Sequence, residues 1–156
     1  MPQNAQNLST EVKTELEAML NQVVAEVVVT TMLAQNFHWN VKGMAFGPLH
    51  EMFQEIYEDH FEAQDEVAER LKALGGHAEG RLSEMVKMSK VDEQDGTQKA
   101  EEMIKLMSDA QKTVAATIAG AAAYADDAGD VATHDLLIGR QLTHEKFAWL
   151  LDAHLG

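Results

Sequence analysis

The chain has 156 residues, enough for one domain with a substantial core. Hydrophobic residues make up 46% and charged residues 24%, with only two prolines, which is typical of a globular protein and excludes a disordered one. The 12 basic and 26 acidic residues give a net charge of −14, so the protein should repel nucleic-acid phosphates and attract cations.

The sequence contains no cysteine, which excludes disulfides and thiolate metal sites. Any metal site must use His, Asp and Glu, which suit iron, manganese or zinc. The first residues, MPQNAQNLSTEVKTEL, lack the basic and apolar regions of a signal peptide, and no stretch of about 20 residues is uniformly apolar. We therefore expect a cytoplasmic protein without a membrane span.

The first predicted helix covers residues 8 to 38 and follows a short flexible tail, residues 1–8. Ser9 or Thr10 can cap it. The run at 27–31, VVVTT, favours a strand locally, but a longer helical period outweighs it. The residues at this period, which predict one buried face, are Val12, Leu16, Met19, Val23, Val27, Thr30, Ala34 and His38.

A break then separates the first helix from the second. Gly43, Gly47 and Pro48 interrupt the pattern, with the proline placed near the first turn of the next helix. The second helix should run from about 48 to 74 and end at Gly75-Gly76, a natural C-cap.

A long connection, residues 77–96, follows the second helix and contains LSEMVKM at 82–88, which could form a short helix. Two more long helices are expected at about 97–127 and 131–154. Four long helices with one long crossover predict a single all-α domain, residues 1–156, with the ferritin-like four-helix arrangement.

Residues that commonly bind metals lie at two places. His38 and His50 flank the break and can therefore lie close together. Asp65 and Glu69 are one turn apart on the second helix and can share a metal. His50 and Asp65 are roughly 22 Å apart along that helix at 1.5 Å per residue, too far for one ion. The chain therefore carries two half-sites at opposite ends of the second helix.

Two arrangements could complete these half-sites. Other helices of the same chain could supply Glu-x-x-His motifs, but no histidine here has a glutamate three residues before it. Alternatively, two copies of the second helix pack antiparallel about a two-fold axis near residues 58 to 60. His50 of one chain then faces Asp65 and Glu69 of the other. This simpler geometry predicts at least a dimer.

The motifs around these residues resemble the signature of the Dps family, the mini-ferritins. HWNV-x-G begins at His38, LH ends at His50, and DEVAERL begins at Asp65 and is followed by GG. HEKFAWLL at 144–151 extends the similarity to the last helix. The resemblance implies a dodecameric cage that stores iron and oxidises Fe(II), typically with hydrogen peroxide, or with oxygen, and so protects against oxidative stress.

The resemblance also implies that the oxidation sites are shared between two-fold-related subunits. The matching ligand-type residues are His38 and His50 from one subunit, with Asp65 and Glu69 from the other. One position departs, because similar proteins usually have an acidic residue where this chain has Gln54. A neutral amide binds a hard cation less well, so we expect a second iron that is weakly held or is recruited only during turnover. Zinc on the histidines stays an alternative.

Other residues near these motifs have two interpretations each. Trp39, next to His38, and Trp149 could quench stray oxidants, although core packing explains Trp39 as simply. His60, near the predicted two-fold centre, could contact a partner chain or pack internally. Arg70 could pair with Glu66 at i,i+4. The histidines interpreted as structural or surface residues are His77, His134, His144 and His154.

The run DDAGDVATHD, residues 126 to 135, joins the last two helices. By the resemblance, Asp126, Asp130 and Asp135 are candidates to line iron-entry pores on three-fold axes. The simpler interpretation is a capped acidic loop with Asp130 as the N-cap.

Two other functions stay open from the sequence. Some similar proteins compact DNA, but the acidic charge and the lack of a basic terminal run argue against direct DNA binding. A structural bundle with a degenerate metal site is the other alternative, motivated by Gln54.

Overall fold

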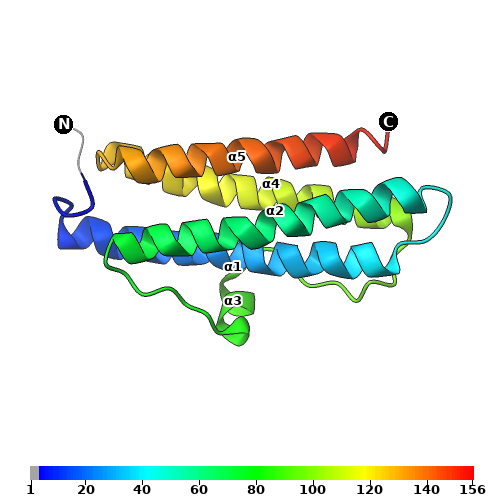
Figure 1. The fold of residues 1–156 in the computed structure, drawn as a ribbon, viewed down its shortest axis with the longest axis horizontal. Helices are drawn as coiled ribbons and strands as arrows, with labels where there is room; N and C mark the ends of the chain where they lie inside the picture. The colour runs from blue at the N-terminus through cyan, green and yellow to red at the C-terminus, as the bar shows by residue number, and fades with distance from the viewer. Residues whose placement is uncertain (1–3) are drawn as a thin grey trace.

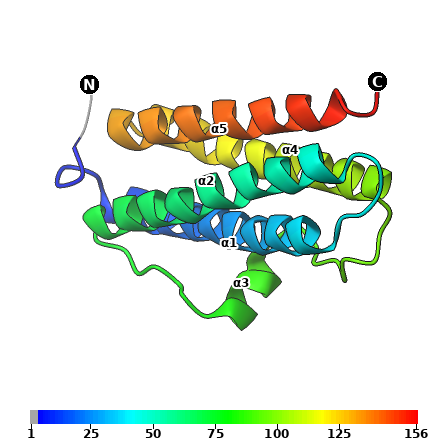
Figure 2. The same cartoon turned by 45° about the vertical axis from the view of Figure 1, so that its right-hand side comes forward.

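The computed structural model describes residues 4–156, and these residues form five α-helices and no strand (Figure 1). The helices are α1 (Thr10–Asn40), α2 (Phe46–Ala73), α3 (Leu82–Met88), α4 (Ala100–Asp127) and α5 (Val131–Asp152). The four long helices lie side by side as a bundle, and the short α3 lies outside it beneath α1 (Figures 1 and 2). The predicted all-α, ferritin-like bundle with a short helix in its crossover is confirmed.

Helix α1 forms the centre of the core, as its period predicts. Ser9 caps it by accepting a hydrogen bond from the backbone N–H of Val12 at 3.2 Å. The β-branched run at 27–31 is helical because the burial of this face outweighs local propensity. Of the predicted tail, residues 1–3 lie outside the described part of the chain, residues 5–7 form a turn, and Leu8 packs into the core.

Helix α1 is also long and apolar enough to cross a membrane, judged by length and composition alone. Within the bundle, however, 56% of its most apolar window is buried. Helix α1 is therefore a core helix of the bundle, and its burial explains its apolar composition.

The ends of α2 follow from its flanking residues. Its first turn includes Pro48, which is tolerated there because the first N–H groups of a helix have no partner within it. At the other end Gly75 adopts φ +88°, and the N–H of Gly76 donates to the carbonyl of Leu71 at 3.1 Å. The predicted glycine cap is therefore confirmed.

Helix α4 begins three residues later than predicted. The carboxylate of Asp95 accepts hydrogen bonds from the backbone N–H and the hydroxyl of Thr97, at 2.9 and 2.7 Å. These bonds hold a turn that competes with helix formation at this point.

Polar side chains of α1 fasten the long crossover onto the bundle. The amide of Asn21 donates to the carbonyl of His77 at 2.9 Å and accepts from the N–H of Glu79 at 2.9 Å. Asn36 donates to the carbonyl of Gln94 at 2.9 Å, near the other end of the crossover. The crossover is thus held at both ends, which fixes α3 against α1.

Candidate metal centre

His38 and His50 are locked together at the junction of α1 and α2. The Nδ1–H of His38 donates to the carbonyl of His50 at 2.7 Å, and the Nδ1–H of His50 donates to the carbonyl of His38 at 2.8 Å. The two rings stack with centroids 3.7 Å apart and an interplanar angle of 16°. This reciprocal pairing fixes one tautomer of each ring and leaves both Nε2 atoms available to bind a metal.

Two aromatic side chains complete the surroundings of this pair. Phe46 stacks on His50 with centroids 4.9 Å apart, and Tyr57 presents its edge to His38 at 5.3 Å. Tyr57 is two helical turns beyond His50 and so shares its face of α2. We did not predict Phe46 or Tyr57 from the sequence, although the seven-residue spacing from His50 could have identified Tyr57.

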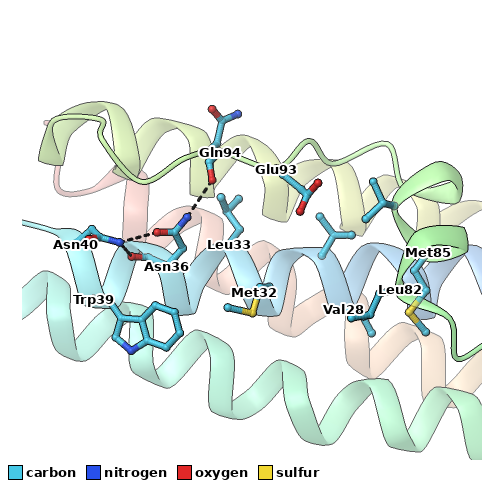
Figure 3. Close-up of a pocket in the computed structure, with 12 residues that line it drawn as sticks. Val28, Met32, Leu33, Asn36, Trp39, Asn40, Leu82, Met85, Glu93 and Gln94 are labelled. Carbon is cyan, nitrogen blue, oxygen red and sulfur yellow. Dashed lines mark hydrogen bonds between the residues drawn. The ribbon is translucent and has the colours of Figure 1, made fainter.

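Trp39 lies elsewhere, despite being next to His38 in sequence. Its side chain is 60% exposed and lines an apolar groove between α1 and α3, with Met32 and Met85 (Figure 3). Successive helical residues point about 100° apart, which directs the indole away from the histidine pair. The interpretation of Trp39 as a core residue is therefore wrong for the single subunit. Its role in quenching oxidants stays a prediction.

Gln54 lies on α2 one turn beyond His50. Its amide Nε2 donates to the carboxylate of Glu58 at 2.9 Å. This bond occupies one donor of the amide, and the amide oxygen is then the atom that can act as a ligand. Gln54 therefore has one neutral oxygen that could bind a metal, one helical turn beyond His50.

Asp65 and Glu69 are both exposed, one turn apart on α2. Asp65 borders a shallow groove that also contacts Phe61, whose ring is 65% exposed, and Met85. Among residues 4–156, no three metal-binding side chains converge. The structure thus brings the two histidines together and leaves the acidic pair as a second half-site, and completion by a partner chain stays a prediction.

Arg70 follows Glu69 and holds this end of α2 to the start of α5. Its Nε donates to the hydroxyl of Thr133 at 2.8 Å, and its NH2 group to the carboxylate of Asp130 at 3.0 Å. The predicted pairing of Arg70 with Glu66 is wrong, because Asp130 is fully buried and gives the guanidinium a more favourable partner.

The acidic loop between α4 and α5 divides into buried and exposed groups. Asp130 is the N-cap of α5, as predicted, and accepts from the N–H of Thr133 at 3.1 Å. Because Asp130 is buried and paired, its side chain does not face solvent in the subunit. Asp126 and Asp135 are exposed, and the pore prediction therefore rests on these two.

A closed ring of hydrogen bonds lies inside the bundle, where we did not predict one. Asp59 accepts from the Nδ1–H of His60 at 2.9 Å and from Arg140 at 2.8 Å. Gln111 donates to Nε2 of His60 at 2.9 Å and accepts from the Nδ1–H of His144 at 2.8 Å. Arg140 donates to Nε2 of His144 at 3.1 Å, which completes the core polar ring.

Charge in the core polar ring is confined to Asp59 and Arg140. Burial lowers the pKa of His144 to about 2 and also lowers the pKa of His60, so both rings are neutral. Burial alone would raise the pKa of Asp59, but hydrogen bonds from His60 and Arg140 outweigh it and lower that pKa. His60 thus packs internally, and His144 is structural, as expected.

Comparisons with known proteins give a consistent result. A family model described as a ferritin-like domain matches residues 17–156. The DNA protection during starvation protein 2 of Bacillus anthracis is 34% identical over 138 residues, which cover 88% of this chain and 94% of that protein.

Two solved structures are similar over almost their whole length. The Dps protein from Bacillus brevis is 32% identical, with a TM-score of 0.91 over 96% of this chain and all of that one. The Dps protein from Vibrio cholerae, described as a member of a broad superfamily of ferritin-like diiron-carboxylate proteins, is 28% identical. Its TM-score is 0.93, over all of this chain and 98% of that one.

Proposed function

Because this chain belongs to the ferritin-like family, and within it to the Dps group of mini-ferritins, we propose that it oxidises Fe(II) and stores the Fe(III) product. The oxidant is hydrogen peroxide, and the store is the interior of a closed cage, by the resemblance a dodecamer. In the cytoplasm this reaction protects against oxidative stress by removing iron and peroxide together.

The observation that carries the proposal is the reciprocal lock between His38 and His50. It leaves one Nε2 atom per ring available as a ligand, and Gln54 lies one turn beyond His50 on α2. Second-sphere bonds that fix a histidine tautomer are typical of metal ligands.

The oxidation site is proposed to be shared between two subunits. A hard ion such as Fe(III) needs carboxylates, and the proposed ligands His38, His50 and Gln54 include none. Asp65 and Glu69 of a two-fold partner supply these carboxylates. Each pair of subunits then contains two identical sites. The carboxylates also favour Fe(III) over Fe(II) and so promote the loss of an electron.

The apolar surface of the subunit supports this assembly. Two adjoining grooves over α1, α2 and α3 both contact Val28 and Met85. Large exposed apolar side chains line them, namely Met32 at 49%, Trp39 at 60%, Phe61 at 65%, Leu82 at 69% and Val86 at 44% exposed. A contiguous surface of this kind is typical of a subunit interface, and it adjoins the acidic half-site.

The reaction balances with two metal ions per peroxide. Two Fe(II), one hydrogen peroxide and two protons give two Fe(III) and two waters. Delivering both electrons to one peroxide avoids release of a hydroxyl radical, the product of one-electron transfer. The exposed Asp126 and Asp135 are proposed to admit the cations at three-fold axes.

Stopped-flow absorbance tests the proposal by following Fe(III) formation after Fe(II) and peroxide are mixed, with oxygen compared. We expect faster oxidation with peroxide, and a loss of about tenfold or more in the Asp65→Ala, Glu69→Ala double variant. Glu66→Ala is the matched control, because Glu66 is equally exposed on α2 but is no proposed ligand. An unchanged rate in the double variant would contradict the catalytic assignment.

Zinc is a second candidate for the histidine half-site, because two imidazoles and carboxylates suit it as well as iron. Zinc has no redox chemistry and would inhibit the reaction. Adding one equivalent of Zn(II) per subunit before Fe(II) should slow oxidation if both ions use these histidines, and should leave it unchanged if they do not.

A further inference from the structure

Glu26 is a carboxylate that lies inside the bundle without a positively charged partner. Its side chain is fully buried on α1. One carboxylate oxygen, Oε2, accepts hydrogen bonds from the amide of Gln22 at 3.0 Å and from the backbone N–H of Lys90 at 3.2 Å. Both donors are neutral groups, and Glu26 forms no salt bridge within residues 4–156. A buried charge in this state is strongly unfavourable, so a positive charge is expected beside it.

The other carboxylate oxygen of Glu26 belongs to a group of buried oxygens without hydrogen-bond partners. Within the described part of the chain, the group includes Oε1 of Glu26, Oγ1 of Thr30 and Oγ1 of Thr117. Thr31, by contrast, donates to the carbonyl of Val27 at 2.7 Å, the usual bond of a threonine inside a helix. Nearly every buried polar atom in a folded protein has a partner, so these three oxygens indicate a bound group.

The three oxygens lie along one contact between α1 and α4. Glu26, Thr30 and Leu33 are spaced by four and three residues and therefore share one face of α1. Leu33 lines a groove together with Ala110 of α4, and Thr117 lies two turns beyond Ala110 on the same face. Glu26 lies two turns before Leu33, and the two helices run in opposite directions (Figure 1). Glu26 and Thr117 therefore come to the same level of the bundle.

Neither a proton nor a water molecule satisfies this cluster. A proton on Glu26 removes the charge but leaves the hydroxyls of Thr30 and Thr117 without partners. A water molecule can bond to the oxygens but leaves the buried negative charge uncompensated. A cation does both, because it binds oxygen ligands and carries the missing charge.

The ligand atoms favour a hard cation with a single charge. All three are oxygens, which suit hard cations better than metals that prefer nitrogen or sulfur. A cation about 2.4 Å from two oxygens holds them roughly 3.5 to 5 Å apart, which suits side chains one helical turn apart that do not bond to each other. The single carboxylate of Glu26 balances one positive charge, whereas calcium sites commonly use several carboxylates.

The groove between α1, α4 and the crossover gives a cation access to this cluster. It has a volume of about 160 Å³, and Lys90, whose backbone N–H bonds to Glu26, lines it. Asp92 and Asp109 line it as well, and their carboxylates attract cations towards this part of the bundle.

We propose that Glu26, Thr30 and Thr117 bind one alkali-metal cation of the size of sodium. The cation neutralises the buried carboxylate, and that carboxylate holds the backbone N–H of Lys90. Ion binding thus fastens the part of the crossover that follows α3 onto α1 and α4. The ion is structural and takes no part in electron transfer, so the site is independent of the proposed oxidation of iron.

Thermal unfolding of the assembled protein in two salts of equal ionic strength tests this proposal. Sodium chloride supplies the ion, whereas choline chloride supplies a cation too large for a buried site. We expect a melting temperature about 5 °C higher in sodium chloride, because an ion that binds only the folded protein stabilises it. Equal melting temperatures in the two salts would overturn the proposal.

Three variants assign the effect to this cluster. Glu26→Gln keeps the shape of the side chain but needs no counter-charge, so the two salts should give equal melting temperatures. Thr30→Val removes one ligand oxygen and should raise the sodium concentration that gives half of the stabilisation. Glu15→Gln is the matched control, because Glu15 is exposed on α1, and it should retain the full difference. A difference between the salts that persists in Glu26→Gln would contradict the assignment.

Crystals of the wild-type protein soaked in thallium(I) acetate locate the ion directly. Thallium(I) replaces alkali-metal cations and scatters X-rays anomalously. We expect an anomalous peak beside Glu26 and Thr30. Density there without an anomalous signal would identify a water molecule and overturn the proposal, whatever the stability of the variants.

Discussion

At the scale of single residues, the pairing of His38 with His50 depends on two carbonyl groups at the ends of two helices. Each imidazole donates to the backbone carbonyl of the other histidine, so neither ring can rotate without losing a hydrogen bond. In the proposed function, this arrangement positions the two imidazoles before a metal binds.

Changing Gln54→Asp should increase the number of Fe(II) ions bound per site from one towards two. The added carboxylate neutralises a second cation in a site where charge limits occupancy. Anaerobic isothermal titration calorimetry measures this stoichiometry. Gln141→Asp on α5 adds the same charge on an exposed helix away from the site and should change nothing, and an equal increase there would point to nonspecific attraction.

The residues of the half-sites could be predicted from the sequence because they follow from spacing along the chain. The break between α1 and α2 brings His38 near His50, and four-residue spacing puts Asp65 beside Glu69. The partner of Arg70 could not be predicted in this way. Arg70 pairs with a residue sixty positions away, and sequence spacing favoured its neighbour Glu66.

At the scale of helices, the core polar ring joins the middles of α2, α4 and α5. Its histidines are neutral because burial disfavours their charged forms. Every hydrogen bond of the ring has a defined direction, which fixes the rotation of each helix relative to the others. Periodicity predicted the apolar faces of these helices. It could not predict that Gln111 and Arg140 would be the hydrogen-bond partners of His144.

Lowering the pH should destabilise the bundle through these two histidines. In the unfolded chain they take up protons below about pH 6.5, whereas the fold keeps them neutral. Stability is therefore lost as pH falls, by about 2 kcal/mol at pH 5 for His144, and the lowered pKa of His60 adds to this loss. The lowered pKa of Asp59 adds a further loss below about pH 4.

Thermal unfolding followed by circular dichroism between pH 7 and pH 5 measures this effect. His144→Gln removes one of the two groups, and the melting temperature of this variant should depend less steeply on pH. His77→Gln is the control, because His77 is exposed, and it should retain the full pH dependence. Equal slopes in all three proteins would contradict the neutral, buried state of His144.

At the scale of the whole molecule, the net charge of −14 and the apolar face of α1, α2 and α3 act on different partners. The charge attracts iron and repels polyanions, while the apolar face favours association with another copy of the chain. The fold and the family could be predicted from motifs that span the chain. The separation of the two half-sites along α2 also predicts a two-fold pairing, but the sequence does not show which other surfaces meet in the assembly.

We expect no retardation of duplex DNA in an electrophoretic mobility assay at moderate salt. The described chain has no basic patch to replace the counterions of the phosphates, and the first basic residue is Lys13. The relative from Bacillus anthracis is named for DNA protection. For this chain, such protection would come from removing iron and peroxide, and a salt-sensitive shift would show direct binding instead.

The shared site is the central claim, and co-assembly of two inactive variants tests it most directly. One variant carries His38→Gln and His50→Gln, and the other carries Asp65→Asn and Glu69→Gln. Each alone should form the same assembly by size-exclusion chromatography and oxidise Fe(II) slowly. When the two variants are co-expressed in equal amounts and assemble at random, half of the two-fold pairs contain one subunit of each. Each mixed pair regains one of its two sites.

The account therefore predicts that the co-assembled protein recovers about a quarter of the wild-type initial rate of Fe(II) oxidation with peroxide. Sites built within single subunits would give no recovery, because every subunit would still lack one set of ligands. Activity no higher than that of the two separate variants would contradict a metal centre shared between His38 and His50 of one chain and Asp65 and Glu69 of another.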